Sequence, residues 1–270
     1  MTRAPTAQPP PGPPERGGTD TPSGPPGADG PDGAAIGPTG SALAERFAAV
    51  RERIAAAAAR GGRAGADVLL VAVSKEVTPA RVADAVAAGQ THFGENRAQE
   101  LAHKIAELGD GISWHFLGRL QRNKVPGVVG AVTLLHSVDR LELAEAVARR
   151  ARALGVVQRV LVQVNVGHDP AKAGVDPVEA PRLVAQLHEL DGLRCEGLMT
   201  VPPADRDPQP AFAALRTIGS SLHDRFPEMV HLSMGMSGDF EAAIEEGATI
   251  VRLGQALFGP RPPARAERRT

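Results

Sequence analysis

The sequence of 270 residues contains no tyrosine, one cysteine and four lysines. Because Cys195 is the only cysteine, no internal disulfide can form, and nothing in the chain requires an oxidising compartment. The sequence has no run of about 18 apolar residues, which excludes a typical transmembrane helix, and its first residues lack the apolar core of a signal peptide. We therefore expect a cytoplasmic protein that does not bind membranes.

Neither sign of charge is in excess, because the formal net charge is -1. This balance gives no reason to expect nucleic acid as a partner. The four lysines are Lys75, Lys104, Lys124 and Lys172, and all other basic side chains except histidine are arginine. Since arginine can supply surface charge but cannot form a Schiff base at neutral pH, each retained lysine is more informative than usual.

Proline and glycine divide the chain into parts. Residues 1–40 hold 20 Pro or Gly residues and almost no large apolar ones, so they cannot offset the entropy of ordering. We expect a disordered tail over 1–40, one domain over 41–261, and a second short tail over 262–270.

Within the domain, strand-like and helix-like segments alternate. A helix is expected over 41–60, and the apolar run Val68–Val73 is typical of a strand buried on both faces of a parallel sheet. Helix starts are expected at Thr78 with Pro79, and at Asp139 and Asp176, each with a glutamate three residues later. The expected strands cover 67–73, 91–94, 113–117, 132–136, 159–165, 193–198, 230–233 and 249–253.

Eight alternating units over about 220 residues predict an α/β protein with a closed (β/α)8 TIM barrel. An open doubly wound sheet is the alternative. The strand count and the lack of a GxGxxG turn favour the barrel. In a barrel, chemistry lies where strands end and the following loops begin.

Lys75 directly follows the first strand, which directs it towards the barrel mouth. Apolar walls there would lower the pKa of its amine and make it a better nucleophile. From position alone, an ordinary solvated lysine at the start of a loop is an equal alternative.

A phosphate site is predicted where the seventh and eighth strands end. Gly235 and Gly238 let the backbone approach a ligand, and Ser237 suits the N-cap of a helix over 240–246. Gly254 ends the eighth strand, and barrels often bind phosphate between these two loops. The alternative is a pair of ordinary tight turns with a serine cap.

Other polar residues at strand ends leave two interpretations open. Asn96 and Asn165 could contact a ligand or stabilise their own loops. His115 fits a hydrogen-bonded core histidine better than a ligand contact. No spacing of His, Cys, Asp and Glu indicates a metal site, and the sequence has no GxSxG elbow or Walker loop.

These segments together resemble the pyridoxal phosphate homeostasis protein family, which is similar to the N-terminal barrel of alanine racemase. The resemblance covers residues 41–261. Several family members carry a second lysine two residues after the Schiff-base lysine, where this chain has Val77. The matching stretches are 72–75, 93–96, 99–100, 114–118, 120–121, 123–124, 163–165, 172–174, 197–199, 232–237 and 251–254.

The resemblance implies that pyridoxal 5'-phosphate (PLP) is the cofactor, held as a Schiff base on Lys75. It implies phosphate contacts from Ser237 and the backbone of Gly254 and Gln255, and it places Arg252 opposite the pyridine nitrogen. We include Asn96 among the cofactor-binding candidates. A cation at the ring nitrogen would weaken the ring as an electron sink, which favours storage of the cofactor over carbanion chemistry.

We therefore expect a monomeric PLP carrier without catalysis, which serves PLP homeostasis and hands PLP to PLP-dependent apoenzymes. The alternative is a PLP-dependent racemase or decarboxylase, and a third option is a phosphate-binding barrel enzyme without PLP. Racemases that resemble this barrel use a tyrosine from a second domain as one base. This chain has no tyrosine, and we expect no second domain after residue 261.

Overall fold

The protein, described here from a computed structural model over residues 40–260, contains a closed barrel of parallel strands. Each strand pairs with the next, and β8 returns to pair with β1. This confirms the predicted (β/α)8 fold, and the predicted strand limits agree to within two residues. The predicted tail over 262–270 lies outside the described residues, as does the predicted tail over 1–40 except for Gly40, which is the first residue of α1. In the described part the strands are β1 Leu69–Val73, β2 His92–Glu95, β3 Ser113–Phe116, β4 Leu134–Val138, β5 Gln158–Gln163, β6 Leu193–Met199, β7 His231–Ser233 and β8 Ile250–Leu253.

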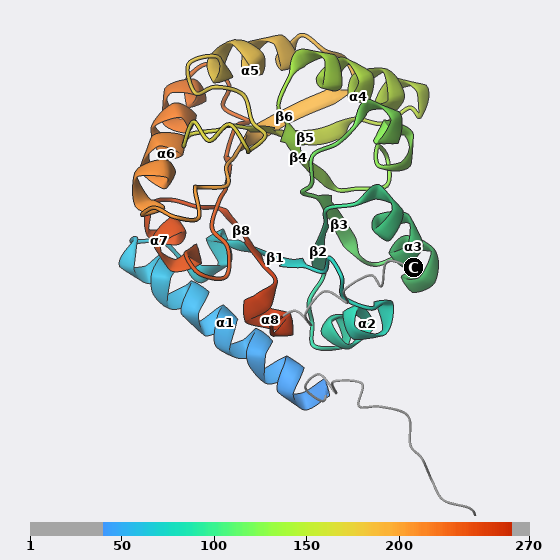
Figure 1. Ribbon diagram of the computed structural model, residues 1–270, viewed down its shortest axis with the longest axis vertical. Helices are drawn as coiled ribbons and strands as arrows, with labels where there is room; N and C mark the ends of the chain where they lie inside the picture. The colour runs from blue at the N-terminus through green and yellow to red at the C-terminus, as the bar shows by residue number, and fades with distance from the viewer. Residues whose placement is uncertain (1–39, 261–270) are drawn as a thin grey trace, which may run out of the picture. The chain divides into compact units, whose positions relative to one another are not determined.

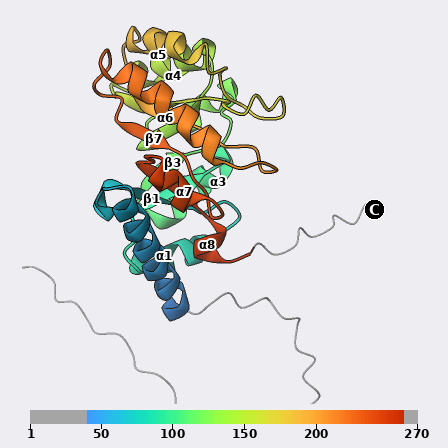
Figure 2. The same ribbon diagram turned by 90° about the vertical axis from the view of Figure 1, so that its left-hand side faces the viewer.

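Helices surround the strands (Figure 1). The helix α1 precedes the first strand and lies beside α7 and α8 (Figure 2). None of the helices in residues 40–260 is long and apolar enough to cross a bilayer. The α-helices are α1 Gly40–Arg60, α2 Pro79–Ala87, α3 Ala98–Leu108, α4 Leu141–Ala153, α5 Ala180–His188, α6 Gln209–His223, α7 Phe240–Glu245 and α8 Gln255–Phe258, and the short 3-10 helices are η1 Gly65–Asp67 and η2 Arg122–Gly127.

The predicted helix starts were right at one position and wrong at two. The Thr78 side chain accepts a hydrogen bond from the Arg81 amide, as an N-cap does. In contrast, α4 begins after Arg140 with no side-chain cap, because the Asp139 carboxylate pairs with Arg140. The Asp176 carboxylate instead accepts from the amide of Val178 in the loop before α5, so it organises a turn rather than a helix end.

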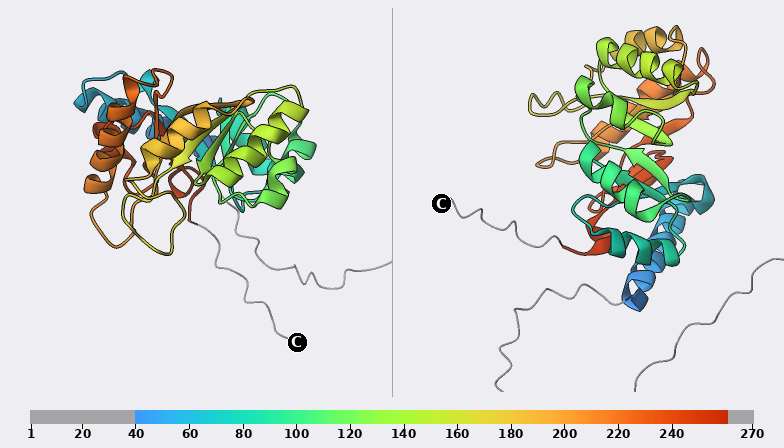
Figure 3. Two further views of the ribbon diagram at one scale, coloured as in Figure 1. Left: turned by 90° about the horizontal axis from the view of Figure 1, so that it is seen from above. Right: turned by 90° about the vertical axis from the view of Figure 1, so that its right-hand side faces the viewer.

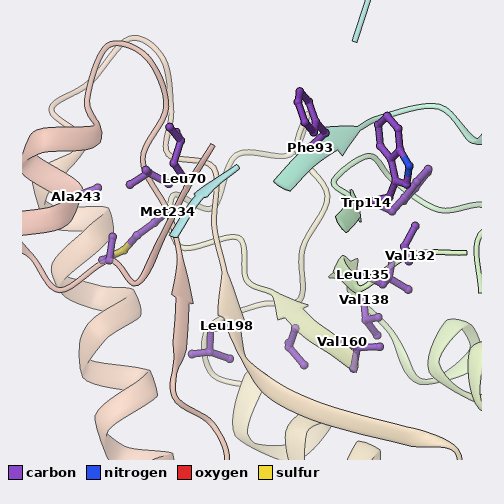
Figure 4. Packing of buried hydrophobic residues seen from close by; sticks show 14 of the residues in the cluster. Leu70, Phe93, Trp114, Val132, Leu135, Val138, Val160, Leu198, Met234 and Ala243 are labelled. Atoms are coloured by element: carbon purple, nitrogen blue, oxygen red, sulfur yellow. The ribbon is translucent and has the colours of Figure 1, made fainter. Parts of the chain in front are cut away.

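The core has two layers that follow the alternation of side chains along each strand. Outward-facing residues such as Phe93, Trp114 and Leu135 pack under the helices (Figure 4). A smaller group from five strands fills part of the barrel interior: Val71, Leu134, Leu161, Met199 and Ile250.

The interior is not wholly apolar. His115, His136, Ser233 and Arg252 are all buried and lie on inward-facing positions of β3, β4, β7 and β8. Long loops follow β5 and β6, and both project to the same side in Figure 3. The polar interior and the strand ends therefore define where a ligand can meet charged groups.

Candidate functional site at the barrel mouth

Lys75 lies two residues after the end of β1 and is half-buried, in the place at the mouth that the sequence predicts. The turn around it is held on both sides. The Ser74 amide donates to the Gly94 carbonyl at 3.0 Å, and the Glu76 amide donates to the Glu100 carboxylate at 3.1 Å. Glu76 has a φ of 63°, a left-handed conformation that a non-glycine residue adopts only where its surroundings impose it.

A buried ion pair lies behind this turn. The Lys104 ammonium donates to Glu95 Oε1 at 2.6 Å and to the Ser74 carbonyl at 2.6 Å. The Ser74 hydroxyl donates to the same Glu95 oxygen at 2.6 Å. Burial raises the pKa of the Glu95 carboxyl, and the hydrogen bonds from Lys104 and Ser74 oppose that rise. The pair therefore ties the residue before Lys75 to β2 and α3.

The barrel register brings β8 beside β1, with Val71 opposite Arg252. The Arg252 guanidinium is buried and donates to Ser233 Oγ at 2.7 Å and to the Thr200 carbonyl at 2.8 Å. Burial lowers its pKa to about 10, which leaves it charged at neutral pH. Among residues 40–260, no carboxylate lies within ion-pair distance of it. A buried cation that makes no ion pair, with only the more distant charge of Asp239 to oppose its burial, favours an anionic or electron-rich ligand nearby.

Ser237 links the loops after β7 and β8. Its hydroxyl oxygen accepts from the amides of Gly254 at 3.3 Å and Ala256 at 3.1 Å. The expected N-cap role of Ser237 is wrong, because α7 begins after Asp239, without a side-chain cap. Since the oxygen accepts both bonds, the hydroxyl proton remains a donor for a ligand oxygen.

The remaining predicted residues lie on the same rim. Asn96 is half-buried at the end of β2, and Gln255 is exposed at the start of α8. A Cβ on Gly118 would lie 2.1 Å from the Asn96 carbonyl oxygen, so the ends of β2 and β3 approach more closely than any other residue type would permit. The six predicted binding residues belong to four consecutive strands of the closed barrel, β7, β8, β1 and β2: five of them follow a strand, and Arg252 is the penultimate residue of β8.

Two other polar residues, for which the sequence left a ligand contact and a structural role open, have a structural role. The Asn165 side chain donates to the Asp169 carbonyl and accepts from the Asp169 amide, so it stabilises its own loop. His115 is a hydrogen-bonded core histidine, as expected, since both ring nitrogens contact other imidazoles.

Sequence reasoning missed several residues that shape this site. Ser233, Thr200 and His136 were not singled out, because their contacts to Arg252 or to one another join strands far apart in the chain. The sequence did contain a signal for the Glu95–Lys104 pair, because lysine is rare in it and a retained lysine is therefore informative. The structure shows that Lys104 is buried.

Comparison with known proteins agrees with the barrel fold. The family model of the alanine racemase N-terminal domain matches residues 46–262. An alanine racemase from Clostridium difficile shares this fold at 20% identity, with a TM-score of 0.56 over 73% of this chain and 53% of that one. The chain thus has the barrel that alanine racemases carry as their N-terminal domain.

Closer relatives define the family more narrowly. The chain is 44% identical over 207 residues to a pyridoxal phosphate homeostasis protein of Aquifex aeolicus, covering 75% of this chain and 91% of that one. It is 39% identical over 211 residues to the Escherichia coli K12 protein of the same name, covering 76% and 90%. The chain belongs to the pyridoxal phosphate homeostasis protein family.

A solved structure of a relative supports the same assignment. The structure of PipY from Synechococcus elongatus PCC7942 with PLP bound has a TM-score of 0.72 and 39% identity to this chain. The alignment covers 80% of this chain and 100% of PipY. The PLP-free PipY structure matches with a TM-score of 0.74.

Proposed function

We propose that this protein holds PLP as a Schiff base on Lys75 and releases it to other proteins, without turning over a substrate. The observation that carries the proposal is the position of Lys75 at the end of β1, next to the strand that holds the buried Arg252. The relatives' names and the PLP-bound PipY structure point to the same cofactor.

Each residue has a part that its chemistry suits. PLP supplies an aldehyde for a lysine amine, a phosphate and an aromatic ring nitrogen. Lys75 offers the amine, and Asn96 borders the ring. The Ser237 hydroxyl proton and the Gln255 amide offer donors for the phosphate, and the Gly254 amide, which donates to Ser237 Oγ at 3.3 Å, would be shared between that oxygen and the phosphate. The Arg252 guanidinium uses two N–H groups for Ser233 and Thr200, and of its five donors three remain for a ligand.

Arg252 also gives a reason to expect no catalytic turnover. A guanidinium opposite the ring nitrogen disfavours protonation of that nitrogen, because two positive charges would meet in a buried site. An unprotonated ring withdraws electrons less well and supports carbanion chemistry poorly. The residues therefore suit storage and transfer of the cofactor to PLP-dependent apoenzymes.

The proposal is tested by titrating the purified protein with PLP and following absorbance. Lys75→Arg keeps the positive charge but cannot form a Schiff base. We expect this variant to remain folded and to lose the Schiff-base absorption band. Lys172→Arg is the matched control, since Lys172 is another mouth lysine that donates to the carbonyls of Val201 and Pro202. A normal band in Lys75→Arg would refute the assignment.

The carrier proposal and the enzyme alternative differ in proton exchange at the amino-acid α-carbon. The chain has no tyrosine to serve as a second base, so we expect no multiple-turnover deuterium exchange with a panel of amino acids. Stoichiometric PLP transfer to an apoenzyme should proceed in parallel. Rapid exchange that disappears in Lys75→Arg would show that the protein is an enzyme.

A further inference from the structure

Three imidazoles form a continuous chain inside the barrel. His92 Nδ1 lies 2.9 Å from His115 Nε2, and His115 Nδ1 lies 2.9 Å from His136 Nε2. The three residues come from the adjacent strands β2, β3 and β4. The chain then reaches β7, where His136 Nδ1 lies 2.9 Å from Ser233 Oγ. Ser233 is the residue that accepts from Arg252.

The chain of imidazoles runs through the interior of the barrel rather than across its surface. His115 is 1% exposed, and His136 and Ser233 are fully buried. At its other end, His92 is half-buried and lines a cavity of about 910 Å³ beside the amino ends of the strands. The imidazoles therefore connect that cavity with the cation at the mouth.

Burial favours the neutral form of the buried rings. Burial, with smaller effects from neighbouring histidines and arginines, lowers the pKa of His115 to about 3 and holds that of His136 well below its usual value. The pKa of His92 is lowered as well, mainly by burial. A neutral imidazole has one N–H donor and one acceptor nitrogen. A ring that accepts from one neighbour must therefore donate to the other, and the direction of one hydrogen bond fixes the direction of the next.

Arg252 determines that direction. A guanidinium can only donate, so Ser233 Oγ accepts from it. The structure gives the Ser233 hydroxyl one other polar side-chain contact in residues 40–260, the His136 ring. If His136 donated to Ser233, the buried hydroxyl proton would have no acceptor, at a cost of about 1–3 kcal/mol.

The satisfied arrangement is therefore unique. Ser233 donates to His136 Nδ1, His136 Nε2–H donates to His115 Nδ1, and His115 Nε2–H donates to His92 Nδ1. All three rings then carry their proton on Nε2. This direction presents a lone pair of Ser233 to Arg252 at a fixed place.

We propose that the chain His92–His115–His136, acting through Ser233, is a positioning device for the Arg252 guanidinium. It holds the cation opposite the place where the ring nitrogen of PLP would lie, so its residues influence the bound cofactor without touching it. The inference about the cofactor rests on the proposed function, whereas the direction of the chain does not. Chains of buried hydrogen bonds polarise one another, which strengthens the last bond, to Arg252.

The first test determines the protonation of the three histidines in the absence of PLP. The full-length protein, labelled with ¹⁵N-histidine, is studied by NMR at neutral pH. We expect His115, His136 and His92 as neutral rings protonated on Nε2, with assignments from His→Gln variants. A proton on Nδ1 of His136, or a charged ring at His115 or His136, would overturn the inference. This result does not depend on whether the protein binds PLP.

The second test determines whether the three histidines influence the bound cofactor. His136→Leu removes both hydrogen bonds, whereas His136→Gln retains one donor and one acceptor. We expect His136→Leu to shift the absorption maximum of the Schiff base and weaken PLP binding by about tenfold, and His136→Gln to restore both in large part.

A matched control separates positioning from stability. Leu135→Ala alters the outward-facing neighbour on the same strand, so it should lower the unfolding temperature without shifting the spectrum. If His136→Leu lowered only the unfolding temperature and left spectrum and affinity unchanged, the chain would be merely structural. If even the unaltered protein lacked the Schiff-base band, the proposed function would fail while the NMR result would stand.

Discussion

At the mouth of the barrel, donors from different strands face one small region. Arg252 presents a buried charge, and Ser237 gathers the amides of Gly254 and Ala256. In the proposed site the two would serve different parts of PLP, because a delocalised cation suits an aromatic ring nitrogen and a hydroxyl with amides suits a phosphate. Single substitutions at these positions should therefore separate ring binding from phosphate binding.

Ser237→Ala is expected to weaken PLP binding by about 1.5–3 kcal/mol, roughly tenfold or more in affinity, because one hydrogen bond to a charged group is lost. Pyridoxal, which has no phosphate, should lose less. Equilibrium titration of both ligands measures the difference. An equal loss for both would mean that Ser237 only joins the two loops and does not touch the phosphate.

Residues were predictable from sequence when their role depended on their place along the chain. Lys75 and Ser237 follow strands whose apolar runs could be recognised, so their location at the mouth followed from the barrel. The partners of Arg252 could not be predicted in this way. Ser233 is 19 residues away and Thr200 is 52 residues away, and only strand register decides which inward-facing residues meet.

The turn between β1 and α2 shows how elements hold the site. β2 and α3 supply Glu95 and Lys104, whose buried pair binds both the carbonyl and the hydroxyl of Ser74. The turn thus depends on side chains that follow it by 20 residues or more. Such buried pairs contribute little compared with an apolar replacement, but removal of one partner is costly.

Lys104→Met should lower the free energy of unfolding by about 3–5 kcal/mol, because the Glu95 charge is left uncompensated. Loss of the ammonium raises the pKa of Glu95 further above that of the unfolded chain. A carboxyl with a raised folded pKa binds more protons in the native state, so stability falls as pH rises through and above the ordinary carboxyl range. Denaturant unfolding of the variant should therefore show a smaller loss at acidic pH.

The double variant Glu95→Gln/Lys104→Met is the control for that prediction. It removes the charge that Lys104→Met leaves behind, so it should recover part of the stability and lose the pH dependence. A Lys104→Met loss that is the same at acidic and neutral pH would show that the packing of the lysine stem, and not its charge, stabilises the turn.

Elements were predictable where buried strands and local caps carry their own signal. The strand β1 consists only of Leu, Val and Ala, as is typical of a parallel strand that is covered on both faces. The N-cap at Thr78 was also correct. The proposed caps at Asp139 and Asp176 failed because each carboxylate found a nearer partner, Arg140 or the Val178 amide. Sequence spacing alone does not reveal such competition.

At the scale of the whole molecule, barrel closure makes the site. Lys75 and Arg252 are 177 positions apart in sequence, yet β1 and β8 pair directly. The same closure brings the three imidazoles and Ser233 into one interior. An open sheet would have left β1 and β8 without each other as neighbours, so the proposed cofactor site requires the closed form.

The four lysines lie in different parts of the fold. Lys104 is buried in its ion pair, and Lys172 donates to carbonyls of the loop after β6. Lys124 lies in η2, after β3. Among the four, only Lys75 lies just after β1, one of the two strands that pair with β8. The lysine that forms the Schiff base therefore identifies the site.

The most direct measurement is reduction of the PLP-loaded protein with borohydride, followed by mass mapping of its peptides. Borohydride fixes a Schiff base to the lysine that formed it. The site described here predicts one modified peptide, which contains Lys75, at about one cofactor per chain. Modification centred on Lys104, Lys124 or Lys172 instead would contradict it.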